Sequence, residues 1–363
     1  MVDMMENQNN QKRKISDILF SWKFLICISI FIFIFTLILS FKSFYLRSKV
    51  NDYKKFFVEI EQKEEPFTKI IKTDLMDEEI LKVSAADRLR DCISSDNEEI
   101  GENVQNIINE INNYYNQSNN YFAFAYKDLH TGFTVIYNGN QPIFTASTIK
   151  APADIYIYEM ASLGEIDLSK KLKYTGNYYN VGTGVLKNKS VDTEYDIKTL
   201  LEYSIVYSDN AAHNMLMDYF GRNNMYDFWK RQGTDVIFRD NNNWGVINAH
   251  DALIYMEELY KFYITDETYG PEIMNNFFNA VPKFISGKNS YKVANKSGWS
   301  GSAIHDVSIV FAENPYIVVA LSNLGGTNNY YDYFSKVNDM AYRLHTEYWK
   351  DKINNCSSIS QYK

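Results

Sequence analysis

The order of the segments along this chain predicts an α/β (α+β) fold with one mixed antiparallel sheet. Residues 121–139 form two apolar stretches around a His-Thr-Gly turn, which is typical of a β-hairpin. Helical patterns dominate residues 148–260. Two short apolar strands follow at 305–313 and 316–323. Because strands precede and follow the helical part, we expect the first and last strands to pair, with flanking helices and an inserted all-helical subdomain.

Amphipathic helices are expected on both sides of this arrangement. The segment VQNIINEINNYY, residues 104–115, has apolar side chains at helical spacing. A second helix is expected over about 331–351. Its apolar face is made by Phe334, Val337, Met340, Leu344 and Tyr348. The two helices bound a predicted domain at residues 102–351, followed by a tail at 352–363.

The composition is that of an ordinary globular protein with appended segments. The 363 residues suffice for one domain of about 250 residues and further elements. The formal net charge is −8 and basic residues form no cluster, so we expect no nucleic-acid partner. The three cysteines and five histidines show no metal-ligand spacing, so we expect no metal and no other cofactor.

Residues 24–41 form an uninterrupted uncharged run of 18 residues, flanked by Lys23 and Lys42. A helix of this length can cross a bilayer, and the run is too long for the apolar core of a cleaved signal peptide. We expect an uncleaved single-pass transmembrane anchor after a cytoplasmic segment at 1–23. Residues 42–101 are charged and predict a stalk. Because basic residues lie on both sides of the anchor, the charge pattern leaves its orientation open.

Three short motifs stand in order within the predicted domain. They are Ser147-Thr148-Ile149-Lys150, Ser208-Asp209-Asn210 and Lys296-Ser297-Gly298. The first two serines are 61 residues apart, and the third motif begins 88 residues after Ser208. The set resembles the S-x-x-K, S-D-N and K-[ST]-G signature of class A β-lactamases and penicillin-binding proteins. The resemblance covers about residues 102–350 and implies a β-lactamase/DD-peptidase-like fold.

The residue types in these motifs suit nucleophilic catalysis by a serine. On a helix, Ser147 and Lys150 lie one turn apart on the same face. Serine needs a base to remove its proton, and a buried lysine beside another cation, here Lys296, has a lowered pKa and can be that base. Ser208 can relay a proton to the leaving nitrogen. The predicted catalytic residues are therefore Ser147, Lys150, Ser208 and Lys296.

Other positions are expected to bind the substrate. Asn210 can hold Lys150 and a substrate amide, and Ser297 can offer its hydroxyl to a substrate carboxylate. Gly298 would let the substrate backbone approach the strand edge closely, and Ser300 is expected to bind substrate beside it.

The oxyanion hole is expected at the junction of the first and third motifs. The resemblance implies that it uses the backbone N–H groups of Ser147 and Trp299. Asp209 is expected to bond nearby backbone and not to take part in the chemistry.

One element of the class A signature is missing. Class A β-lactamases carry a glutamate between the second and third motifs, in an E-x-x-L-N pattern, which activates the water that hydrolyses the acyl-enzyme. No glutamate lies between Asn210 and Glu257. Asp240 and Asn243 are the nearest substitutes, and Asp235 is a poorer one. We therefore expect acylation by β-lactams followed by slow deacylation.

The leading interpretation is a serine hydrolase that acts on amide bonds of β-lactams or related D-Ala-type cell-wall peptides. Such substrates lie outside the cytoplasmic membrane, so the C-terminal domain is expected to face outward. Cys92 and Cys356 would then lie in an oxidising space, where a disulfide between them can form. Two alternatives stay open: a non-hydrolytic domain that binds or senses penicillin or peptidoglycan fragments, and a structural envelope protein.

Overall fold

The protein is described by a computed structural model over residues 100–117, 121–239, 243–287 and 291–355. The predicted anchor, the stalk up to residue 99, Cys92, Cys356 and Asp240 lie outside these ranges. Within them, no helix combines the length and apolar character needed to cross a membrane. The same ranges hold no group of three or more His, Cys, Asp or Glu side chains that could bind a metal ion.

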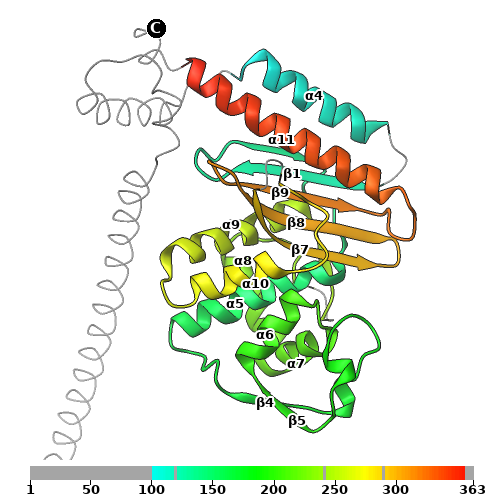
Figure 1. The fold of residues 1–363 in the computed structure, drawn as a ribbon, viewed down its shortest axis with the longest axis vertical. Coiled ribbons are helices and arrows are strands. Elements are labelled where there is room, and N and C mark those ends of the chain that lie inside the picture. Colours follow the sequence, from blue (N-terminus) through cyan, green and yellow to red (C-terminus); the bar gives the residue numbers. More distant parts are fainter. Residues whose placement is uncertain (1–99, 118–120, 240–242, 288–290, 356–363) are drawn as a thin grey trace, which may run out of the picture. The chain divides into compact units, whose positions relative to one another are not determined.

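A five-stranded sheet of order β2-β1-β9-β8-β7 forms the centre of the domain (Figure 1). The expected pairing of the first and last strands is confirmed, since β1 pairs with β9 from Phe122↔Ser322 to Asp128↔Tyr316. All four pairings are antiparallel, in agreement with the antiparallel sheet expected. The strands are β1 (Phe122–Asp128), β2 (Thr134–Tyr137), β7 (Lys292–Ser300), β8 (Ala303–Phe311) and β9 (Tyr316–Ser322).

Two helices cover one face of this sheet, α4 (Glu102–Asn116) and α11 (Tyr330–Asn355) (Figure 1). Both were predicted from their apolar spacing, and the predicted apolar faces are buried. Val104, Ile111, Val337 and Leu344 are fully buried in one cluster with the side chains of this sheet face. The backbone N–H of Gly101 donates to Asp351 Oδ2 over 2.8 Å, so the start of α4 is tied to the end of α11.

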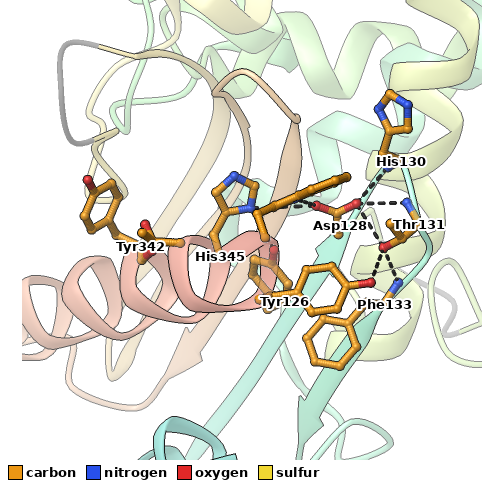
Figure 2. Close-up of polar contacts among 10 residues, drawn as sticks. Tyr126, Asp128, His130, Thr131, Phe133, Tyr342 and His345 are labelled. Carbon is orange, nitrogen blue, oxygen red and sulfur yellow. Dashed lines mark hydrogen bonds and ion pairs between the residues drawn. The ribbon is translucent and has the colours of Figure 1, made fainter. Parts of the chain in front are cut away.

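A buried polar network joins α11 to the end of β1 (Figure 2). The carboxylate of Asp128 accepts hydrogen bonds from the backbone N–H of His130 (3.0 Å) and from Trp349 Nε1 (2.7 Å). His345 Nδ1 lies 3.7 Å from the same carboxylate and 2.9 Å from the hydroxyl of Tyr126. Burial lowers the pKa of His345 to about 4, so the ring is neutral at pH 7 and can accept the Tyr126 proton.

The other face of the sheet carries a helical layer (Figure 1). Its central helix is α5, in which Ala151, Ala153, Ile155 and Ile157 are all fully buried. A helix that is apolar on almost every side can be stable only inside a core, and α5 is packed among the other helices of this layer. The helices are α5 (Lys150–Ser162), α6 (Ile197–Val206), α7 (Asn210–Phe220), α8 (Arg222–Arg231), α9 (Ala249–Thr265) and α10 (Gly270–Asn279).

The inserted subdomain is not all-helical, which corrects one expectation. Two small antiparallel ladders lie within it: β3 (Ile143–Phe144) pairs with β6 (Val246–Ile247), and β4 (Lys171–Tyr174) pairs with β5 (Thr193–Asp196). Strands of two to four residues are too short for an alternating pattern to stand out in the sequence. Three short 3₁₀ turns complete the layer: η1 (Ala146–Ile149), η2 (Gly176–Tyr178) and η3 (Leu186–Asn188).

Candidate active site

Ser147 lies in the 3₁₀ turn η1, which runs directly into α5. Ala146 before it has a φ of 44°, which is uncommon for a residue other than glycine. The hydroxyl of Thr148 donates to the carbonyl of Thr145 over 2.6 Å and closes the turn. Ser147 itself is partly exposed, so a hydroxyl accessible to a ligand is fixed to the most deeply buried helix of the domain.

Lys150, the first residue of α5, is fully buried. Its Nζ lies 3.0 Å from Ser147 Oγ, as the one-turn spacing predicted. It also donates to Ser208 O and to Asn210 Oδ1, both over 2.8 Å, and lies 3.3 Å from Ser208 Oγ. Burial, and after it the charge of Lys296, holds the pKa of Lys150 well below its usual value.

A neutral amine fits these partners. The carbonyl of Ser208 and Oδ1 of Asn210 can only accept hydrogen bonds, so they take the two N–H groups of a neutral Lys150. The remaining lone pair is then available to the hydroxyl of Ser147, which can donate its proton to it. The arrangement therefore suits removal of the Ser147 proton by Lys150.

Ser208 lies between the two buried lysines. Its hydroxyl accepts a hydrogen bond from Lys296 Nζ over 3.0 Å, in addition to its contact with Lys150. Lys296 also donates to the carbonyl of Ser297 over 2.9 Å, and burial lowers the pKa of Lys296 to about 8. The structure thus places Ser147, Lys150, Ser208 and Lys296 in one connected chain of contacts.

Asp209 is buried and forms the N-cap of α7. Its Oδ1 accepts hydrogen bonds from the backbone N–H groups of Ala211 and Ala212, over 2.9 and 3.0 Å. Its Oδ2 accepts from those of Val185 and Leu186, over 2.6 and 2.7 Å. Asp209 therefore binds four backbone N–H groups and fixes the two motif residues beside it, which is the structural role expected from the sequence.

Strand β7 lies at the edge of the sheet and packs on the η1 turn at Gly298. A Cβ atom at Gly298 would lie 3.0 Å from the backbone N atoms of Ser147 and Thr148 and from the carbonyl O of Thr145. Real Cβ contacts are seldom this short, so any other residue would force the strand and the turn apart by a few tenths of an ångström. The structure therefore gives a different reason for glycine than the close approach of a substrate.

The remaining predicted substrate-binding residues follow along β7. Ser297 is 5% exposed, whereas Trp299 is 51% exposed and Ser300 is also exposed at the strand end. The ring of Trp299 rests against that of Tyr330, with centroids 5.3 Å apart. The two strand residues before Trp299 contact Lys296 and the η1 turn, so the strand that leads into Trp299 is held against this turn.

Sequence reasoning missed one residue of this site, Trp244. Lys150 Nζ lies 5.0 Å from the centroid of its ring, and the ring of His213 lies 5.2 Å away from it. Burial, and after it the charge of Lys150, lowers the pKa of His213 to about 3. The only signal in the sequence was the position of Trp244 in the Asn-rich loop that lacks the glutamate. Asp240, in the same loop, lies outside the described residues.

Residues 105–343 match the sequence profile of the β-lactamase enzyme family, and this match spans more than half of the chain. The chain belongs to this family. Membership of the β-lactamase family agrees with the order of the three motifs.

Individual members of the β-lactamase family are distant relatives. A β-lactamase from Bacillus licheniformis is 34% identical over 94 residues, which cover 26% of this chain and 30% of that protein. The chain thus matches less than a third of the length of this relative.

Solved structures related to the β-lactamase family have the same fold. PBP-A has a TM-score of 0.62 at 19% identity, over 67% of this chain and 96% of PBP-A. A PBP-A mutant, solved as an acyl-enzyme complex with penicillin G, has a TM-score of 0.61 at 18% identity, over 68% of this chain and 96% of its own. A β-lactamase from Sphaerobacter thermophilus has a TM-score of 0.57 at 16% identity, over 66% and 94%. The predicted β-lactamase-like fold is therefore confirmed.

Proposed function

We propose that this protein is a membrane-anchored, extracytoplasmic serine hydrolase. It forms an acyl-enzyme at Ser147 with β-lactams or related D-Ala-type peptides and releases the acyl group slowly. The observation that carries the proposal is the chain of contacts from Ser147 Oγ through Lys150 Nζ and Ser208 Oγ to Lys296 Nζ, over 3.0, 3.3 and 3.0 Å. Such a chain can carry a proton from the attacking oxygen to the leaving nitrogen.

Acylation uses each member of this chain once. Lys150 takes the proton of Ser147 as its oxygen attacks the carbonyl carbon of the substrate. The negative charge on the carbonyl oxygen is stabilised by the backbone N–H groups of Ser147 and Trp299. The C–N bond then breaks, and the nitrogen receives a proton through Ser208. Lys296, when protonated, attracts the substrate carboxylate, and Ser297 offers it a hydroxyl.

Deacylation lacks its usual base. No glutamate lies between Asn210 and Glu257, and Asp240 is the nearest carboxylate in the loop. His213 does not offer a replacement, because it is fully buried and its Nε2 is already bonded to the carbonyl of Asn243. Without a well-placed base for water, the ester at Ser147 should persist after the leaving nitrogen has departed.

The membrane part of the proposal rests on the sequence. The uncharged run at 24–41 has the length of a spanning helix, and cell-wall peptides lie outside the cytoplasmic membrane. We therefore place the catalytic domain on the outer side, as a single-pass protein with a cytoplasmic N-terminus.

Labelling of the full-length protein in detergent with a fluorescent penicillin tests the proposal. Wild type should carry one covalent adduct for minutes, seen in a denaturing gel and as a mass increase of the intact chain. Ser147→Ala should carry none. Absence of an adduct on the wild type would exclude the proposed chemistry and favour a structural envelope role.

A second function is favoured by the missing glutamate: a non-hydrolytic receptor that captures a penicillin or a peptidoglycan fragment. It predicts the same adduct at Ser147 but no turnover. Nitrocefin hydrolysis measured over many enzyme equivalents separates the two, since a receptor should stop at one equivalent. Rapid turnover that is abolished by Asp240→Ala would instead identify Asp240 as the missing base and an efficient β-lactamase.

A further inference from the structure

We infer that Trp244 sets the lifetime of the acyl-enzyme, because its indole ring covers the side of Lys150 from which a hydrolytic water could be activated. This inference rests on the proposed acylation of Ser147. Slow release of the acyl group then has two causes, the missing loop glutamate and the presence of Trp244.

The indole ring is packed between two site residues. Lys150 Nζ lies over the indole face, 5.0 Å from the ring centroid. The ring of His213 also contacts the indole, with ring centroids 5.2 Å apart and an interplanar angle of 52°. His213 is fully buried, so the indole cannot move toward α7.

The backbone around Trp244 is tied to the segment that precedes the nucleophile. The N–H of Thr145 donates to the carbonyl of Gly245 over 3.3 Å, and the hydroxyl of Thr145 donates to the carbonyl of Trp244. Immediately beyond, β6 pairs with β3, with Ile143 opposite Ile247. The loop is therefore bonded to the chain two residues before Ser147. These bonds fix the position of the Trp244 backbone relative to Ser147 Oγ.

A third tie comes from α7. His213 Nε2 lies 3.0 Å from the carbonyl of Asn243, so the neutral ring donates this hydrogen bond through Nε2. The residue before Trp244 is thus anchored on α7, and the residue after it on the η1 segment. Moving the backbone of Trp244 away from Lys150 would require breaking hydrogen bonds on both sides.

The indole of Trp244 covers the side of Lys150 Nζ that its oxygen partners leave open. Four oxygens already surround Nζ at 2.8 to 3.3 Å, from Ser147, Ser208 and Asn210, and the indole lies over it as well. A bound water needs two to four polar partners, and an indole face does not supply them. Lys150, the base that takes the proton of Ser147, is therefore shielded from the water that deacylation requires.

The hydrolytic step shows why this shielding matters. The oxygen of water must bond to the ester carbon while its proton passes to a base. The bond from that carbon to Ser147 Oγ then breaks, Ser147 regains a proton, and the product leaves as a carboxylic acid. With a smaller residue in place of Trp244, water can enter the vacated volume beside Lys150, and Lys150 can accept the proton.

A size series at position 244 of the full-length protein tests the inference. Wild type, Trp244→Phe, Trp244→Leu and Trp244→Ala are labelled with fluorescent penicillin, chased with excess unlabelled penicillin, and followed by gel fluorescence and intact mass. The half-life of the adduct should fall as the side chain becomes smaller. Trp244→Ala should shorten it by about 10-fold or more, whereas Trp244→Phe should stay within about 3-fold of wild type. Acylation rates should change less than release rates.

A matched control removes another aromatic ring from above a lysine. Lys170 Nζ lies 4.8 Å from the ring centroid of Tyr219, which is 43% exposed. Tyr219→Ala should leave the adduct lifetime unchanged.

If Trp244→Ala does not fold, the comparison of Trp244→Leu with Trp244→Phe still tests the inference, since Trp244→Leu should release the acyl group faster. Equal lifetimes across all variants that become labelled would overturn the inference while leaving the proposed acylation intact. Failure of wild type to label would instead refute the proposed function.

Discussion

Lys296 Nζ donates a hydrogen bond to Ser208 Oγ over 3.0 Å, and this contact joins the central sheet to the helical layer. Lys296 lies on β7, and Ser208 lies between α6 and α7. Both side chains are buried, so their separation is set by how the sheet packs on the helices. Any change that moves β7 away from the layer interrupts the proposed proton path without altering a motif residue.

Acylation by β-lactams that carry a carboxylate should weaken above about pH 8. Burial lowers the pKa of Lys296 to about 8, so the side chain is charged below that value and loses its attraction for a carboxylate above it. The second-order acylation rate constant, measured from about pH 6 to about pH 10, should fall on the alkaline side. Lys296→Arg keeps its charge and should remove this fall; a flat wild-type profile would contradict the role given to Lys296.

Asp209→Ala should destabilise the domain by about 3 kcal/mol, because it leaves four backbone N–H groups without their acceptor. Chemical denaturation of the full-length protein measures the difference. Asp167→Ala is the matched control, since this exposed carboxylate also accepts a local backbone N–H, from Ser169. The control should stay within about 0.5 kcal/mol of wild type. Equal effects of both substitutions would show that Asp209 does not anchor the motif.

Gly298→Ala should lower the acylation rate by about 10-fold or more, because the added Cβ would press β7 away from the η1 turn. The strand carries Lys296 and the backbone of Trp299, so both the cation and the oxyanion donor would move. Gly176→Ala provides the control, since a Cβ there meets no atom within 4 Å. Full labelling rates in Gly298→Ala would mean that the strand and the turn can separate without cost to the site.

Stability should fall in acid partly through His345. Burial lowers its pKa to about 4 in the folded protein, against about 6.5 in an unfolded chain. The contribution of neutral His345 to the free energy of unfolding is fully present above about pH 6.5 and is lost as the pH falls through about 4. It is lost because the unfolded chain binds the proton more tightly. Between about pH 7 and about pH 4.5, the free energy of unfolding of His345→Gln should therefore fall by about 2 kcal/mol less than that of wild type. Parallel losses in urea titrations of the two proteins would rule out this contribution.

The motif residues could be predicted because their chemistry depends on short spacings and on order. Ser147 and Lys150 are one turn apart wherever the local chain is helical, and the cap formed by Asp209 is a property of aspartate before a helix. The pairing of β1 with β9 was also predictable, since apolar strands lay at both ends of a helical stretch and a single sheet buries both.

The features that sequence reasoning missed depend on contacts between distant segments. Trp244 has no periodic pattern around it, and its position over Lys150 arises from backbone hydrogen bonds to Thr145 and from packing on His213. The reason for Gly298 likewise lies in a strand packing on a turn that is far away along the chain. Such contacts become visible only when the layers are assembled.

The pairing of β1 with β9 has a consequence for how the protein is made. β1 is synthesised well before the strand that covers its inner edge, Tyr316–Ser322, which comes after the whole helical layer and just before α11. Until then β1 has an open edge, and sheets that depend on such distant pairings close slowly. A chain that stops before Tyr316 contains all three motifs but lacks both β9 and α11. Late truncations should therefore abolish the site as completely as the loss of Ser147.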